Sequence, residues 1–204
     1  PIFHTHGLFV ACNMVLASGA SMDFLSRFDA EQIISLCKNA TVLMGVPTFY
    51  SRLLASKNLT QDATRSIRLF VSGSAPLQVE THRDFKTRTG HVILERYGMT
   101  ETCMITSNPY NGVRRSGTVG LALPQVNLRI VGFGSTTPIK PGEPGAIEVK
   151  GPNVFKGYWQ MPEKTASEFR HDGYFITGDI GSVDEQGYLT IVGRDKDLII
   201  SGGY

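Results

Sequence analysis

The sequence predicts an α/β protein in which a parallel-sheet α/β subdomain is followed by a small β-barrel-like subdomain. From residue 1 to about 105, short apolar runs alternate with runs of helical periodicity, an order typical of a mainly parallel sheet. After about residue 112, glycine and proline become frequent and the apolar runs shorten, which favours an all-β region. We therefore expect one subdomain over 1–112 and a second over 113–193.

The first helix is predicted by its capping residues. Asp29 stands as the N-cap, with Gln32 at the third helical position. Apolar residues then follow at helical spacing, at Ile33, Ile34 and Cys37. The other elements that we expect in the first half are strands at 41–46, 68–72 and 91–97, and helices at 49–55 and 77–89, the last stopped by Gly90.

Alternating apolar and polar residues predict the strands of the second subdomain. Val126, Leu128 and Ile130 alternate with polar neighbours, and residues 146–149 do the same. The turn at 184–187 lies between two apolar runs and predicts a hairpin. The second half therefore reads as a small barrel or a distorted sandwich.

Composition excludes several classes of protein. The 20 basic and 18 acidic residues are spread along the 204-residue chain without a basic stripe, so we expect no nucleic-acid partner. Three widely spaced cysteines predict neither a zinc site nor a disulfide framework, and they favour a reducing compartment. No apolar run is long enough to be a transmembrane segment.

Three glycine-rich segments carry candidate ligand-binding residues. The first, Ser74-Ala75-Pro76 with its flanks, lies between a predicted strand and a predicted helix. Ligands of open α/β sheets bind at this edge, and small residues there let a flat ligand approach the backbone. An ordinary strand-to-helix turn uses the same residues, so both readings stay open.

The second segment runs from Glu95 to Thr102 after another predicted strand. Tyr97 offers a ring face to a base, and Gly98 permits close approach of a ligand. Thr100 offers a hydroxyl, and Glu101 is a hard oxygen ligand suited to Mg²⁺. These groups suit a nucleoside triphosphate, although a polar surface loop has a similar composition.

The third segment places Asp179 and Arg194 in neighbouring β runs. An aspartate at such a position is a natural acceptor for paired ribose hydroxyls. Arg194 is a donor suited to ribose or phosphate. The charged run 194–197 is equally compatible with a solvated turn.

Six segments in a fixed order carry a resemblance that no single one carries alone. They are PIFHTHG, SGSAPL, ERYGMTE, KGPNVFKGYW, GYFITGD and GRDKDLIISGGY. In this order they resemble the adenylate-forming superfamily, which includes acyl-CoA synthetases, luciferases and peptide-synthetase adenylation domains. The resemblance covers essentially the whole chain and implies part of the large N-terminal domain of an acyl-CoA synthetase.

The resemblance implies roles for matching residues. Ser74, Ala75 and Pro76 match the adenine-contacting segment, Tyr97 the stacking residue, and Asp179 a ribose acceptor. Thr100 matches the residue that binds the α-phosphate, Glu101 matches the Mg²⁺ ligand, and His4 matches a residue at the edge of the acid pocket; we take these three as catalytic. The full nucleotide-binding set that we expect is Ser74, Ala75, Pro76, Glu95, Tyr97, Gly98, Thr100, Asp179 and Arg194.

The same resemblance implies a two-step reaction. A carboxylic acid first reacts with ATP to give an acyl adenylate and pyrophosphate, and the thiol of CoA then displaces AMP. Mg²⁺ is the implied cofactor, because it neutralises the phosphates and orients the leaving group.

Six segments together most resemble malonyl-CoA synthetases, and they lie at 3–13, 42–54, 72–77, 81–85, 89–101 and 107–112. A dicarboxylic acid requires a cation for its second carboxylate, and Arg83 is our candidate because a guanidinium binds a carboxylate in a bidentate manner. A solvated helix face is the alternative reading for Arg83. His4, Thr48 and Met99 are the other candidates for the pocket wall, with plain packing as the alternative for Thr48 and Met99.

Two parts of the family pattern are missing from the chain. The phosphate loop upstream of the first segment is absent, and so is the catalytic lysine of the C-terminal domain. Residues 194–204 correspond to the hinge, at Lys196, and to the start of that domain. We therefore expect a piece of a longer enzyme, inactive alone. The alternatives are a ligase for another short acid, a carrier-loading adenylation domain, and a non-catalytic nucleotide-binding fragment.

Overall fold

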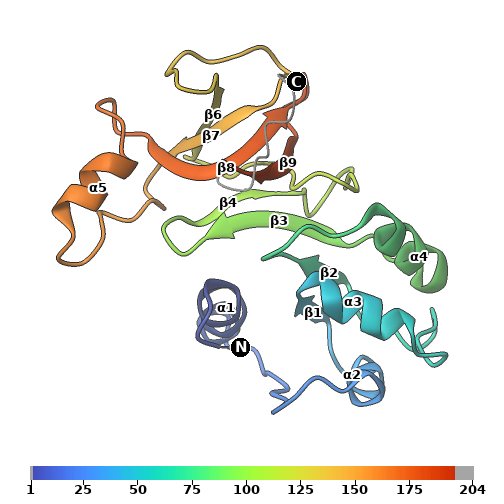
Figure 1. The fold of residues 1–204 in the computed structure, drawn as a ribbon. Helices are drawn as coiled ribbons and strands as arrows, with labels where there is room; N and C mark the ends of the chain where they lie inside the picture. Colours follow the sequence, from blue (N-terminus) through green and yellow to red (C-terminus); the bar gives the residue numbers. More distant parts are fainter. Residues whose placement is uncertain (1, 196–204) are drawn as a thin grey trace.

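A computed structural model describes residues 2–195 and confirms the predicted α/β class with a second, antiparallel sheet (Figure 1). The described helices are a π-helix at His6–Cys12, α1 at Asn13–Ala17, α2 at Ala30–Leu36, α3 at Pro47–Leu54, α4 at Val79–Thr89 and α5 at Pro162–Glu168. The strands are β1 at Val42–Gly45, β2 at Leu69–Ser72, β3 at Leu94–Met99, β4 at Cys103–Ser107, β5 at Leu121–Ala122, β6 at Asn127–Val131, β7 at Gly145–Lys150, β8 at Phe175–Val183 and β9 at Leu189–Arg194.

The first sheet has the order β1-β2-β3-β4-β5 and changes direction at β3. β1, β2 and β3 are parallel, whereas β3-β4 and β4-β5 are antiparallel. The parallel part follows from the crossovers through α3 and α4, because a parallel connection needs a crossing segment. β3 therefore joins a parallel sheet on one side to a hairpin on the other.

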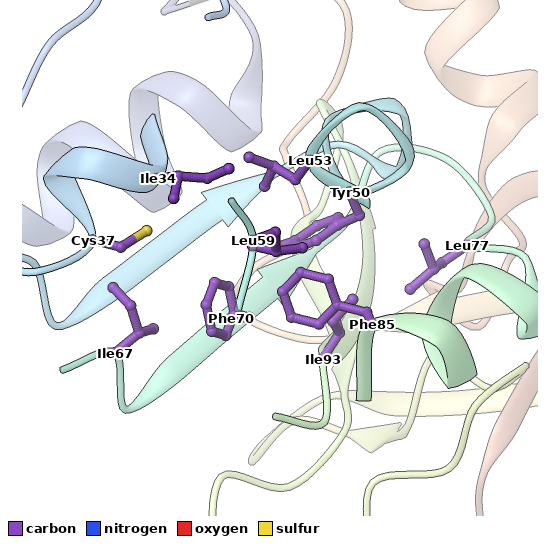
Figure 2. Close-up of a cluster of buried hydrophobic side chains, with 10 residues drawn as sticks. All are labelled: Ile34, Cys37, Tyr50, Leu53, Leu59, Ile67, Phe70, Leu77, Phe85 and Ile93. Atoms are coloured by element: carbon purple, nitrogen blue, oxygen red, sulfur yellow. The ribbon is translucent and has the colours of Figure 1, made fainter. Parts of the chain in front are cut away.

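The core of the parallel part lies between the sheet and its helices (Figure 2). The predicted cap of α2 is confirmed, since the backbone N–H of Gln32 donates to Asp29 Oδ1 at 3.0 Å. Tyr50 on α3 is fully buried and donates its hydroxyl to the Val71 carbonyl. Phe85 on α4 packs edge-on against Tyr50 and Phe70. Because these contacts join α3 and α4 to β2, they fix the strand ends that carry the glycine-rich segments.

The second sheet has the order β6-β7-β8-β9 and is antiparallel throughout. The predicted hairpin is confirmed, with Val183 opposite Leu189. Backbone bonds in both directions between Leu189 and the 119–120 segment attach this sheet to the end of the first. Figure 1 shows it over one face of the β3–β4 hairpin, with α1 on the other face.

One detail differs from the sequence-based expectation. The second half is not all-β, because α5 forms at Pro162–Glu168, where proline at the first turn precedes good helix formers. The first sheet ends with β5 at Ala122, and the second begins with β6 at Asn127. Within the described residues, none of the helices is long and apolar enough to cross a bilayer.

Candidate active site

Tyr97, Asp179 and Arg194 converge from three different strands. Asp179 on β8 and Arg194 on β9 are register partners, and Arg194 Nε lies 3.3 Å from Asp179 Oδ1. The Tyr97 hydroxyl on β3 donates to Asp179 Oδ2 at 2.5 Å. These contacts place side chains separated by almost a hundred positions of sequence in one group.

The environment of this group is uneven. Asp179 is buried, while the Arg194 side chain is 68% exposed. The Tyr97 ring belongs to a second hydrophobic cluster, separate from the core of the parallel part, which also contains Ile147 and Phe175. Burial raises the pKa of Tyr97 above its usual range, and the nearby Asp179 raises it further. Tyr97 is therefore a neutral donor at the edge of this cluster, and its stacking on a base remains a prediction.

Glu101 lies in the turn that joins β3 to β4. The Tyr158 hydroxyl donates to Glu101 Oε1 at 3.0 Å. Burial raises the pKa of Tyr158 to about 12, with the hydrogen bond to Glu101 as the next cause. The neighbouring Thr100 is exposed, and its hydroxyl lies 3.4 Å from that of Thr5. The β3–β4 turn thus presents a hydroxyl and a carboxylate side by side.

Gly98 is required by the hairpin itself. A Cβ atom at this position would lie 1.9 Å from the carbonyl oxygen of Cys103, closer than any side chain permits. The pairing register also shifts between Tyr97 and Gly98. The glycine therefore lets β4 approach β3 at an irregularity next to Thr100 and Glu101.

A small cavity lies on the other face of β3. Its volume is about 20 Å³, and its lining comes from the N-terminal segment, the β2–α4 loop and the β3–β4 hairpin. Adjacent residues of a strand point to opposite faces, so Arg96 faces this cavity while Tyr97 faces Asp179. The lining residues are Thr5, His6, Gly73, Ser74, Arg96, Gly98 and Met104.

His6 is a neutral imidazole at the centre of this lining. Burial, followed by the charge of Arg96, lowers the pKa of His6 to about 4. Arg96 lies 3.1 Å from His6 Nε2, and because a guanidinium can only donate, Nε2 accepts. The proton therefore belongs on Nδ1, which lies 3.4 Å from the Ser74 hydroxyl. A polar chain runs from Arg96 through His6 to Ser74.

Arg96 carries a positive charge that no acidic side chain neutralises in the described part of the chain. None of the ion pairs there includes Arg96, and its Nε has no hydrogen-bond partner. Burial lowers the pKa of Arg96 to about 10. Since a buried unpaired charge is unfavourable, this guanidinium is ready to receive an anion.

The other expected acid-pocket residues lie outside this lining. Arg83 is exposed on α4, where its Nε lies 3.4 Å from Asp84. Thr48 is exposed at the start of α3, and His4 is exposed with its ring against Phe3. Met99 packs against the second hydrophobic cluster. The structure thus gathers Arg96, His6 and Ser74 rather than these four.

The expected adenine segment is exposed. Ser74, Ala75 and Pro76 are all accessible, and Ser74 has a φ of 69°, an unusual conformation for a residue other than glycine. Glu95 behaves differently, since it is 5% exposed and burial raises its pKa to about 7. The predicted hinge residue Lys196 lies outside the described residues.

Sequence reasoning missed Arg96, His6 and Tyr158. A signal was present for Arg96, because Glu95 and Arg96 are two adjacent charges inside a predicted strand. His6 shares the FHTHG motif with His4, and only the fold decides which histidine faces inward. Tyr158 is distant in sequence from Glu101, so no local pattern joins them.

Glu101 fits a role as a magnesium ligand only together with substrate phosphates. No group of three or more His, Cys, Asp or Glu side chains in residues 2–195 is arranged to hold a metal ion. Mg²⁺ in nucleotide sites is commonly bound by one or two carboxylates plus phosphate oxygens and waters. One oxygen of Glu101 is bonded to Tyr158, and Oε2 has no hydrogen-bond partner among the described residues.

Comparison with known proteins defines the class to which this fold and site belong. The sequence profile of the AMP-binding enzyme family matches residues 1–159. The chain therefore belongs to the AMP-binding enzyme family.

Individual members of the family show which of its enzymes this chain is similar to. A malonate–CoA ligase of Arabidopsis thaliana is 40% identical over 225 residues, covering all of this chain and 36% of that protein. The ATP-bound crystal structure of MatB from Rhodopseudomonas palustris is 60% identical with a TM-score of 0.98, covering all of this chain and 41% of that one. The O-succinylbenzoate–CoA synthetase of Bacillus subtilis, in complex with ATP and magnesium, is 30% identical with a TM-score of 0.87, at 100% and 42% coverage. The chain thus spans about two fifths of these relatives.

Proposed function

We propose that this chain is the nucleotide- and acid-binding part of a malonate–CoA ligase. The family membership supports the reaction class, and the 40% identity to a plant malonate–CoA ligase supports the acid. ATP, CoA and malonate are the proposed substrates. The proposed compartment is the cytoplasm or the mitochondrial matrix, and the division into subdomains at residues 112 and 193 also stays a proposal.

In the first proposed step, one carboxylate oxygen of malonate attacks the α-phosphorus of ATP, and the bond to pyrophosphate breaks. In the second, the sulfur of CoA attacks the acyl carbon, the bond to AMP breaks, and the thiol proton is released. We propose that Asp179 and Arg194, which form an ion pair, bind the ribose, and that Thr100 binds the α-phosphate. When bound beside Glu101, Mg²⁺ would neutralise charge on the phosphates.

Arg96 is the single observation that carries the choice of acid. A monocarboxylic acid uses its only carboxylate to attack the phosphorus, and so it has no second carboxylate to pair with Arg96. The second carboxylate of malonate would neutralise Arg96, and Ser74 stands within the same polar chain as a further donor. Because His6 is neutral, the Arg96–His6 pair carries a single positive charge, which one carboxylate of malonate would neutralise.

The test compares Arg96→Ala with Arg83→Ala in the full-length enzyme. Pyrophosphate release is measured against malonate, acetate and methylmalonate concentration. Loss of a desolvated, charge-assisted pair costs about 2–5 kcal/mol, so Arg96→Ala should raise the malonate KM at least about 30-fold. The KM for ATP should stay within about twofold, because Arg96 faces away from Asp179.

The exposed Arg83 provides a matched control for charge. If Arg83→Ala raises the malonate KM and Arg96→Ala does not, the acid binds along α4 and our assignment of the pocket is wrong. If the wild-type enzyme turns over acetate as well as malonate, the proposed substrate is wrong and a ligase for another short acid is the better description.

A further inference from the structure

We propose that Tyr158 is a positioning residue, which orients the Glu101 carboxylate toward the metal–nucleotide complex. This inference rests on the proposed function, since it assumes that Glu101 receives Mg²⁺ together with ATP. It adds a residue from a different part of the chain, because Tyr158 belongs to the segment between β7 and α5. Its evidence is independent of the acid pocket on the other face of β3.

The hydroxyl contact is direct and specific. Tyr158 donates to Glu101 Oε1 at 3.0 Å, an ordinary hydrogen-bond length. Both side chains are partly buried, whereas the adjacent Thr100 is exposed. A carboxylate with one oxygen held in this way loses rotational freedom before any ligand arrives, and its Oε2 is left to bind.

The same segment also holds the backbone around Glu101. The backbone N–H of Phe155 donates to the Glu101 carbonyl at 2.7 Å. The Asn153 side-chain amide donates to the carbonyls of Thr102 and Met104 at 2.9 and 3.0 Å. Residues 153–158 therefore act as a strap over the β3–β4 turn, and Tyr158 supplies its only hydrogen bond to the Glu101 side chain among the described residues.

Tyr158 is itself fixed from three directions. Its backbone N–H donates to Thr165 Oγ1 on α5 at 2.9 Å. Its ring packs edge-on against Phe155, with 4.8 Å between centroids. The ammonium group of Lys164, on α5, lies 4.6 Å from the centroid of the Tyr158 ring. A hydroxyl on so constrained a ring has one principal target, which is Glu101.

The test measures how much Mg²⁺ strengthens ATP binding, with no acid present. In the full-length protein, the Kd for ATP is measured by calorimetry in excess Mg²⁺ and again in EDTA, for the wild type and for Tyr158→Phe. Removing a partner of a metal ligand commonly costs 10–100-fold in metal affinity, so the ratio of the two Kd values should fall about tenfold. The Kd in EDTA should be unchanged, since Phe keeps the ring and its packing.

Tyr188→Phe is the matched control, because it removes a hydroxyl that donates at 2.9 Å to a backbone carbonyl, that of Val113. The proposal requires this variant to keep the wild-type ratio. An unchanged ratio in Tyr158→Phe, or an equal fall in Tyr188→Phe, overturns it.

The design also separates this inference from the proposed substrate. If wild-type ATP binding responds to Mg²⁺ but Tyr158→Phe responds equally, the positioning role fails and malonate turnover is untouched by the result. If Tyr158→Phe shows the expected fall but malonate releases no pyrophosphate from the wild type, the acid is wrong and the positioning role stands.

Discussion

Two buried glutamates, one in each sheet, differ in whether their carboxylates have charged partners. Glu148 on β7 is fully buried between two arginines, with Arg129 Nε at 2.9 Å from one carboxylate oxygen and Arg170 Nε at 2.7 Å from the other. Glu95 on β3 is also buried, but none of the ion pairs of the described residues includes it, and its Oε1 has no hydrogen-bond partner among them.

The arginines show the same contrast. Arg129 is bonded to Glu148 and Asp172, and its guanidinium lies over the Tyr174 ring. Arg96, next to Glu95 in sequence, has no acidic partner in the described residues. The lesson is that saturated buried charges mark structure, whereas unsaturated ones mark the place where a ligand supplies the missing partner.

The largest effect on stability is expected from Glu148→Gln. Removing the shared carboxylate charge leaves two partly buried arginines undercompensated, and breaking such a pair costs about 3 kcal/mol. Urea unfolding measures this loss. Asp172→Asn is the control, because the Asp172 side chain is 52% exposed and its ion pair with Arg129 should contribute much less to stability. Equal losses in both variants would remove the contrast.

An intermediate effect, with a pH dependence, is expected from Glu95→Gln. The pKa of Glu95 is raised by burial to about 7 in the folded protein, above its unfolded value of 4.5. The folded state therefore binds a proton that the unfolded state has lost, so stability is fully present below pH 4.5 and decreases as pH rises through 7. Gln has no such transition, and the two unfolding curves should diverge by about 2 kcal/mol between pH 5 and pH 8.

The measurement for Glu95 is the difference between the two proteins at each pH. This difference cancels the titration of all other groups, His6 included. Parallel curves for wild type and Glu95→Gln would mean that the Glu95 carboxylate is already ionised in the folded protein at pH 5, and the comparison with Glu148 would lose its basis.

The smallest effect on stability is expected from Arg96→Met. A guanidinium without an acidic partner contributes little to folding, and an apolar side chain of similar length should keep the free energy of unfolding within about 1 kcal/mol of the wild type. Thermal unfolding at pH 7 measures it. A loss as large as that of Glu148→Gln would place Arg96 among the structural charges.

Much of the fold could be predicted from local patterns. The cap of α2 at Asp29, the strand–helix alternation and the hairpin at 184–187 each rest on residues close together in sequence. The π-helix could not be predicted in this way, because its hydrogen-bond pattern is unusual. Helix α5 has no side-chain cap and no buried residue, so it lacks the capping and apolar signals that predicted α2. The position at which one sheet ends and the next begins depends on tertiary pairing.

The site divides along the same line. Tyr97, Asp179 and Arg194 were identified from ordered motifs, and the structure brings these three into contact. The choice of Arg83 as the cation rested on the chemistry of its guanidinium, and its role stays a prediction that no contact supports. The assignment of Arg96 to the pocket depends on which face of β3 meets the N-terminal segment, and no local sequence pattern gives that face.

The pairing of Asp179 with Tyr97 and Arg194 has a consequence for how tightly the protein holds AMP. Without a nucleotide, one carboxylate oxygen of Asp179 already accepts a hydrogen bond from Tyr97, and the other is ion-paired with Arg194. A ribose that takes this position exchanges one set of hydrogen bonds for another, so the net gain is modest. Under the proposed function AMP is a product of the reaction, and this competition for Asp179 would then weaken its retention.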